Sequence, residues 1–144
     1  MIGKKLGAAA VILDTQGRVL LVKHTYGPLN WELPGGGAEE GENIVETALR
    51  EVLEETGLHV VAQHTSGIYY NTETDMHHFV FLCQSRDTAL ASRSDGEEIS
   101  ELGFWSPTAL PRPISDFTVL RIADAISGAK QLLPSLVGPR QWLD

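Results

Sequence analysis

Three glutamates that could share a metal ion lie close together in the segment 36–58, namely Glu51, Glu54 and Glu55. In a helix, positions i, i+3 and i+4 fall on one face, so the three carboxylates would lie within reach of a single ion or ion pair. Like charges at this spacing repel, and no lysine lies four residues from Glu51 or Glu55 to offset the repulsion. A solvated acidic helix face is the alternative. Because divalent cations would remove the repulsion, the spacing favours a metal site.

The remaining residues of this segment predict the helix that positions the glutamates. At about 100 degrees per residue, the apolar side chains occupy the arc opposite the carboxylates. This apolar arc consists of Val45, Leu49, Val52 and Leu53. We therefore expect the helix to rest on a core with its three carboxylates facing outward together.

Both ends of this helix carry a recognisable signal. Asn43 can act as N-cap with Glu46 three residues later, an Asn variant of the capping box, and Gly57 can end the helix in a left-handed conformation. Arg50 lies four residues before Glu54 and can hold a carboxylate in place by charge-assisted hydrogen bonds. We expect Arg50 to orient the acidic side chains.

The overall charge limits the partners of the protein. The chain has 144 residues, 42% of them apolar, which is enough for one globular domain over residues 1–144 with a core of its own. Its formal net charge is -8, which argues against a stable complex with nucleic acid or an anionic membrane surface. Seven of the nineteen acids lie between Glu39 and Glu55. A nucleotide would therefore have to bind together with cations.

The single cysteine and the apolar runs bear on location. Cys83 lies in an apolar run and is expected to be a buried small side chain; with one cysteine, no disulfide can form within the chain. No run approaches the roughly 18 apolar residues that span a bilayer. The apolar run after Lys4 and Lys5 is interrupted at Asp14, so we interpret it as a strand and not a signal sequence. A reducing, cytoplasmic location is expected.

The other segments read as strands, loops and one more helix. Residues 7–13 and 19–24 are expected to form a hairpin with Gly17 at a positive φ, and residues 59–71 and 76–86 a second one. Three glycines, 35–37, follow a proline and would permit unusual backbone angles. The remaining predicted elements are a loop over 92–100, a strand over 102–106, a helix over 115–129 capped by Ser115 or Asp116, and a tail from 131 without a clear period.

Residues 36–58 match a known family signature at every fixed position. Gly36 is followed by five residues and Glu42, then by seven residues and the run REVLEETGL at positions 50–58. This segment resembles the Nudix hydrolase signature, G-x5-E-x7-R-E-U-x-E-E-x-G-U. It covers 23 of the 144 residues, and the flanking segments 31–35 and 104–107 also look like those of the family.

The resemblance implies an α/β fold, an α/β/α sandwich with a mixed β-sheet flanked by helices. It also implies hydrolysis of a nucleoside diphosphate linked to another group, with Mg2+ required and Mn2+ as a substitute. The family's metal ligands match Glu51, Glu54 and Glu55, with the carbonyl of Gly35. Glu42 and Arg50 match residues that orient these ligands. Family members are often dimers, so a homodimer is a further expectation.

The residue that removes a proton from the attacking water stays open at this point. Glu54 is a candidate on the helix, and the resemblance to members that use a loop glutamate adds Glu97, Glu98 and Glu101. The expected catalytic set is Glu54, Glu51, Arg50 and Glu98. Each loop glutamate could equally be a solvated surface residue.

The substrate is predicted by elimination. The proline of ADP-ribose enzymes is replaced by Glu73, and the tyrosine of one dinucleoside-polyphosphate group is replaced by Asp75. A nucleoside triphosphate, intact or damaged, is therefore the leading substrate class. A non-catalytic domain that senses a nucleotide or binds a protein partner is the alternative, and a purely structural acidic domain is a third.

Other motifs carry less chemistry. The glycines 35–37 are not followed by Gly-Lys-Ser/Thr, which excludes a phosphate-binding P-loop. The five histidines have no zinc-ligand spacing and are expected to be structural or exposed. Trp31, Tyr69 and Tyr70 could stack on a nucleobase, although aromatic residues of strands more often fill the core.

Overall fold

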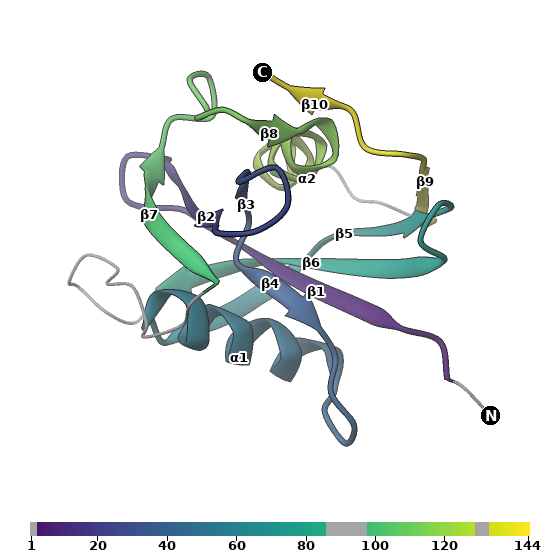
Figure 1. Ribbon diagram of the computed structural model, residues 1–144. Coiled ribbons are helices and arrows are strands. Elements are labelled where there is room, and N and C mark those ends of the chain that lie inside the picture. The colour runs from purple at the N-terminus through teal and green to yellow at the C-terminus, as the bar shows by residue number, and fades with distance from the viewer. Residues whose placement is uncertain (1–2, 86–97, 129–132) are drawn as a thin grey trace.

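The computed structural model describes residues 3–85, 98–128 and 133–144, which form two five-stranded sheets and two helices (Figure 1). The first sheet has the order β4-β1-β6-β5-β9, with β1 (Leu6–Ile12), β4 (Gly35–Gly37), β5 (Val60–Asn71), β6 (Met76–Ser85) and β9 (Ser135–Val137). The second has the order β10-β8-β3-β2-β7, with β2 (Val19–His24), β3 (Trp31–Glu32), β7 (Ile99–Trp105), β8 (Ile114–Ser115) and β10 (Trp142–Leu143). The helices are α1 (Ile44–Thr56) and α2 (Asp116–Ser127).

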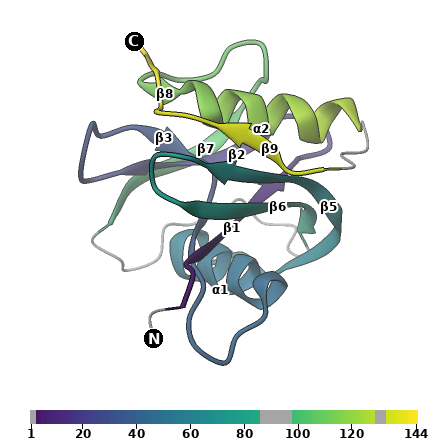
Figure 2. The same cartoon turned by 90° about the vertical axis from the view of Figure 1, so that its right-hand side faces the viewer.

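The first sheet lies between the two helices, as Figure 2 shows from the side. Strand β1 explains why, because its side chains are buried on both faces. Ala10 and Ile12 pack with Val52 of α1 in one core cluster, whereas Ala9 and Val11 belong to the cluster that contains α2. Successive residues of a strand point to opposite faces, so one apolar run supports both helices. The predicted sandwich around a mixed sheet is confirmed, with β1 parallel to β6 and antiparallel to β4.

The first predicted hairpin is only partly correct. Gly17 does adopt a positive φ of 77°, and the turn is closed by a hydrogen bond from the Asp14 amide to the Arg18 carbonyl. However, the two strands pair through a single bridge, Leu13 with Val19, and then enter different sheets. Both edges of β1 are taken by β4 and β6, and both edges of β2 by β3 and β7, which leaves no edge for a longer β1–β2 ladder. The second sheet was therefore not anticipated.

The second predicted hairpin is confirmed. Strands β5 and β6 pair antiparallel along almost their whole length, from Val60–Ser85 to Asn71–Met76. The side chain of Asn71 accepts hydrogen bonds from the amides of Glu73 and Thr74 and so shapes the turn. Two register shifts interrupt the ladder in the first half of β5.

Helix α1 begins and ends where its caps were predicted. The Asn43 side chain accepts from the Glu46 amide, the Glu46 carboxylate accepts from the Asn43 amide, and Gly57 is left-handed at φ 77°. The predicted apolar arc is partly wrong, because Val45 and Leu53 are exposed. The buried side instead includes Ala48, Val52, Thr56 and Glu55, so the helix is rolled toward its carboxylates.

Helix α2 is fixed at its start by a buried ion pair with β3. Ser115 is the N-cap, as predicted. The Arg121 Nη2 atom lies 2.6 Å from Glu32 Oε1, which also accepts from the Thr118 hydroxyl at 2.7 Å and the Leu33 amide at 2.8 Å. Burial alone would raise the pKa of Glu32, but Arg121 and these hydrogen bonds hold it below its usual range. This pair joins α2 to the strand that leads into Gly35.

The C-terminal segment completes both sheets. The sequence showed no period there, yet β9 adds to β5 and β10 adds to β8, each over two or three residues. Of the helices among the described residues, neither is long and apolar enough to cross a membrane.

Replacing Arg121 with methionine should destabilise the fold, because it leaves the Glu32 carboxylate buried without a cation. We expect the free energy of unfolding to fall by about 3 kcal/mol, measured by urea denaturation. Arg18→Met is the matched control, since Arg18 pairs with Asp14 on the surface and should change stability by about 0.5 kcal/mol or less. Equal stability of the two variants would contradict a structural role for the pair.

Candidate metal and substrate site

The glycine strand β4 supports the acidic face of α1. The Gly35 amide donates a hydrogen bond of 2.9 Å to Glu55 Oε1. A Cβ atom at Gly36 would lie 2.6 Å from the carboxylate carbon of Glu51, and one at Gly35 would lie 2.4 Å from the Ala8 carbonyl oxygen. Side chains at either position would push the helix or β1 away. The glycines are therefore needed for close approach.

This finding corrects the expected reason for the glycine run. None of the glycines 35–37 has a positive φ; among the described residues, the glycines with a positive φ are Gly17, Gly27, Gly41, Gly57 and Gly128. Unusual backbone angles thus do not explain Gly35 or Gly36. Gly37 has no atom within 4 Å of an added Cβ, so its position is open.

The three predicted carboxylates are not equally exposed, which corrects the expectation that all face outward. The Glu54 side chain is 57% exposed and the Glu51 side chain 17% exposed, whereas Glu55 is buried at 7%. The gradient follows from the roll of α1 onto β4, since Glu51 and Glu55 lie on the side that contacts the glycines. The three groups start on one face but extend from solvent into the protein.

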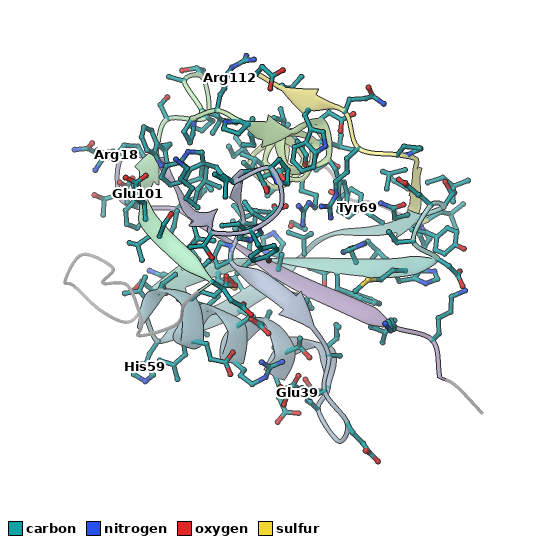
Figure 3. All side chains as sticks on the ribbon, viewed as in Figure 1. Arg18, Glu39, His59, Tyr69, Glu101 and Arg112 are labelled. Carbon is teal, nitrogen blue, oxygen red and sulfur yellow. The ribbon has the colours of Figure 1, made fainter. Side chains whose placement is uncertain are left out.

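Arg50 links most of the acidic groups around the site. Its guanidinium contacts Glu42 at 2.8 Å, Glu51 at 2.9 Å and Glu54 at 3.3 Å, and donates to the Gly37 carbonyl at 3.0 Å. The hydrogen bonds from Arg50 lower the pKa of Glu42 to about 2, with further donation from the Glu39 amide and the Thr47 hydroxyl. Figure 3 shows Glu39 on the segment that leads into α1. The expected orienting roles of Glu42 and Arg50 agree with these contacts.

The carboxyl groups of Glu55 and Glu51 repel one another when both are ionised. Burial, together with the charge of Glu51, raises the pKa of Glu55 to about 8, although the Gly35 amide opposes the shift. Burial likewise raises the pKa of Glu51, against the opposing effect of Arg50. Glu55 has no ion pair with any described residue. As its folded pKa exceeds the unfolded value, its contribution to stability is lost as pH rises from about 4.5 to 8.

A divalent cation fits this donor set. Among the described residues, no three His, Cys, Asp or Glu side chains already form a metal cage. Still, the carboxylates of Glu51 and Glu55 are the hard oxygen ligands that Mg2+ prefers. Both are largely removed from water, and an ionised carboxylate in such a place is costly unless a cation lies beside it. Glu55 is buried and has no ion pair with any described residue, so a divalent ion bound here would stabilise its ionised form.

The loop glutamates differ in their electrostatic influence on these carboxylates. The charge of Glu98 raises the pKa of both Glu51 and Glu55, and the Glu98 carbonyl accepts from the Thr25 amide at 2.9 Å. Glu101 lies opposite Lys23 in the β2–β7 ladder and is exposed; Figure 3 labels it on that strand. Glu97 and most of the loop 92–100 lie outside the described residues.

A pocket of about 330 Å³ adjoins the glycine strand. It lies between the first sheet, α2 and the C-terminal segment, and Gly35, Gly36 and Gly37 form part of its wall. Its polar and aromatic lining consists of His24, Tyr26, Asn30, Glu32, His78, Arg121, Arg140 and Trp142. Most of these residues carry no sequence signal for a site, because they come from four separate stretches of the chain, 24–32, 78, 121 and 140–142, that only the fold brings together.

The other aromatic and titratable groups are mainly structural. Tyr69 and Trp31 are buried in the core, so neither is available to a nucleobase. Tyr69 points from β5 toward α2, where its hydroxyl donates to Asp124 at 2.7 Å (Figure 3). Cys83 is buried as expected, which raises the pKa of its thiol to about 12. Burial lowers the pKa of His78 to about 4.

Comparison with known protein sequences gives a consistent picture. A family model described as the NUDIX domain matches residues 3–122. A putative 8-oxo-dGTP diphosphatase of Bacillus subtilis (strain 168) is 37% identical over 120 residues, covering 77% of this chain and 78% of that protein. A MutT-like protein of Streptomyces ambofaciens is 30% identical over 124 residues, covering 86% and 78%.

Solved structures show the same fold. A NUDIX hydrolase from Nitrosomonas europaea superposes with a TM-score of 0.78 at 18% identity, covering 96% of this chain and 81% of that one. An ADP-ribose pyrophosphatase from Streptococcus suis 89-1591 gives a TM-score of 0.75 at 23% identity, covering 95% and 100%. At these identities the likeness concerns the arrangement of helices and strands.

Alanine substitutions along the glycine strand should separate the site from the fold. Gly36→Ala places a methyl group against Glu51, whose side chain can move, so we expect at least about tenfold weaker Mn2+ binding with little loss of stability. Gly35→Ala collides with the β1 backbone and should lower the free energy of unfolding by about 2 kcal/mol.

Gly37→Ala is the matched control, because an added methyl group there meets no atom within 4 Å. Calorimetric titration with Mn2+ and thermal unfolding would be measured on all three variants. If Gly36→Ala binds Mn2+ as tightly as Gly37→Ala does, then the contact between Gly36 and Glu51 does not shape a metal site.

Proposed function

Since the chain belongs to the Nudix family, we propose that it is a Mg2+-dependent pyrophosphohydrolase that acts on a nucleoside triphosphate, intact or damaged. The products would be the nucleoside monophosphate and pyrophosphate. The observation that carries the proposal is the buried Glu55 carboxyl group next to Glu51. Both lie against Gly35 and Gly36, which line a pocket large enough for part of a nucleotide.

We assign Glu51, Glu54, Glu55 and the Gly35 carbonyl as the residues that would hold Mg2+, with Mn2+ as a substitute. Bound there, the ion would polarise water and neutralise phosphate charge as a Lewis acid. The protein itself supplies the negative charge and its orientation. Arg50 holds Glu51 and Glu54, and Gly35 holds Glu55 through its amide.

We take Glu54 and Glu98 as the leading candidates for the group that accepts the proton from the attacking water; Glu97 lies outside the described residues and stays a prediction. Glu54 is exposed on the helix face, and Arg50 contacts both Glu54 and Glu51. Glu98 comes from the opposite side and lies close enough to influence the pKa of Glu51 and Glu55. A base must lie within hydrogen-bond reach of the proton that it removes. We rank Glu101 below Glu98, because the charge of Glu98, and not that of Glu101, is among the main causes that shift the pKa of Glu51 and Glu55.

Two observations support a nucleoside triphosphate as substrate. The Bacillus subtilis relative is named a putative 8-oxo-dGTP diphosphatase, and Glu73 and Asp75 stand where other substrate classes have a proline and a tyrosine. The buried Cys83, which needs no oxidising environment, is consistent with a cytoplasmic protein. A nucleotide substrate with no nucleic-acid partner fits the net charge of -8. A homodimer stays a prediction.

The alternative is a domain that binds a nucleotide without hydrolysing it. All residues of the catalytic signature are present in this chain, which favours the enzyme. A panel of nucleoside triphosphates, diphosphate sugars and dinucleotides, assayed with and without Mg2+, distinguishes the two. Binding without turnover across the panel would identify a sensor.

Amide substitutions should identify the carboxylates that act in hydrolysis. We expect Glu54→Gln to lower kcat by at least about 100-fold at saturating Mg2+, because the amide cannot accept the proton and binds the ion less well. Pyrophosphate release would be measured under the same conditions for Glu98→Gln. A comparable loss there would assign proton removal to Glu98.

Glu101→Gln is the matched control for Glu98→Gln, since it removes the same charge from an exposed position of β7 near by in the chain. Its kcat should stay within about twofold of the wild type. Near-normal turnover by Glu54→Gln would refute its assigned role.

A further inference from the structure

Four side chains of the pocket lining take no part in the proposed hydrolysis. His24 and Tyr26 come from the end of β2 and the loop that follows, whereas Arg140 and Trp142 come from the C-terminal segment. Both C-terminal residues lie beyond the part of the chain that the NUDIX family model matches, residues 3–122. These side chains are therefore available to the part of a substrate that is not hydrolysed.

His24 and Tyr26 form an aromatic platform at the pocket wall. Their rings are stacked, with centroids 4.6 Å apart and planes 13° apart. His24 covers one face of the Tyr26 ring, yet Tyr26 remains 54% exposed. Burial and the charges of Glu98 and Glu55 raise the pKa of Tyr26, so the platform lies within electrostatic range of these carboxyl groups. A flat ring joined to a phosphate at the metal site could thus stack here.

Arg140 is the pocket cation that is free to bind a ligand. The other arginine of the pocket, Arg121, is buried and paired with Glu32. Arg140 is exposed and has no ion pair with any residue in the described part of the chain. Its guanidinium carbon lies 5.9 Å from the centroid of the Phe117 ring, and its charge helps to lower the pKa of Glu32 and of His24 in the same pocket. Strand β10, which begins two residues later, pairs with β8 and so anchors Arg140 beside the pocket.

The chemistry of a guanidinium limits what Arg140 can recognise. It carries only hydrogen-bond donors, arranged as a planar fork that matches two neighbouring acceptors. A guanine-type base offers two such acceptors, O6 and N7, on one edge, whereas adenine offers an acceptor and a donor there. Arg140 should therefore favour an oxo-purine over adenine.

We propose that Arg140 and the Tyr26–His24 platform select the base of the substrate, with Tyr26 stacking on an oxo-purine and Arg140 reading its acceptor edge. The inference rests on the proposed function, since it takes the ligand to be a nucleotide. Stacking on Tyr26 would strengthen the binding of any base, whereas Arg140 would supply the preference for an oxo-purine.

Calorimetric titration with dGMP and dAMP, two ligands that need no turnover, tests this proposal. The wild type should bind dGMP more tightly than dAMP. Arg140→Gln should weaken dGMP binding about tenfold and dAMP binding about twofold or less. Tyr26→Leu should weaken the binding of both nucleotides to a similar extent. Tyr26→Phe, which keeps an aromatic ring, should bind both as the wild type does. Arg18→Gln removes the same charge outside the pocket and should leave both unchanged.

Three results would overturn the proposal: equal losses for dGMP and dAMP in Arg140→Gln, as expected of a phosphate contact; no change in that variant; or no binding of dGMP to the wild type. The proposed hydrolysis fails separately. If the binding pattern holds but no triphosphate is hydrolysed with Mg2+, base selection by Arg140 and Tyr26 stands and the enzymatic proposal falls.

Discussion

The site depends on the contact between the acidic face of α1 and a strand without side chains. Glu51 and Glu55 can approach the backbone of β4 because Gly36 and Gly35 leave room for them. This approach removes water from carboxylates that also repel one another, which raises the pKa of Glu55 to about 8. Arg50 offsets part of the charge but does not reach Glu55 among its recorded contacts. The fold thus disfavours the ionised form of Glu55, and a cation bound beside it would stabilise that form.

The rest of the architecture keeps this contact in place. Strand β1 is buried on both faces and pairs with β4, so the glycine strand is fixed relative to the core that α1 covers. On the other side, the ion pair between Glu32 and Arg121 joins α2 to the residues immediately before Gly35. The pocket forms between these two supports, and the C-terminal segment closes one of its sides. Stability and a substrate-sized space arise from the same packing.

Local signals in the sequence predicted local structure well. The caps Asn43, Glu46 and Gly57 depend on neighbouring residues, and each was found as expected. The β5–β6 hairpin and the start of α2 at Ser115 are local in the same sense. By contrast, the burial of Glu55 was not predictable from helical spacing, because it depends on how α1 is rolled against β4. Val45 and Leu53 were assigned to the core for the same reason.

Features that join distant segments were also missed. The second sheet was missed because its strands pair with partners far along the chain, as β2 does with β7. Strands β9 and β10 were missed because they are too short to show a pattern. The glycine run was noticed, but its purpose is visible only when Glu51 lies against Gly36. Arg140 and Tyr26 lie more than a hundred residues apart, so no sequence pattern brings them to one pocket.

Thermal unfolding of Glu55→Gln with and without Mg2+ tests the central claim most directly. The comparison belongs at about pH 9, where the wild-type carboxyl is ionised. Without Mg2+, the variant should be at least as stable as the wild type, because the buried charge is gone. With saturating Mg2+ and no nucleotide, the wild-type Tm should rise clearly more than that of the variant. The account would be contradicted if Glu55→Gln had a lower Tm than the wild type without Mg2+ and if Mg2+ raised the Tm of both proteins equally.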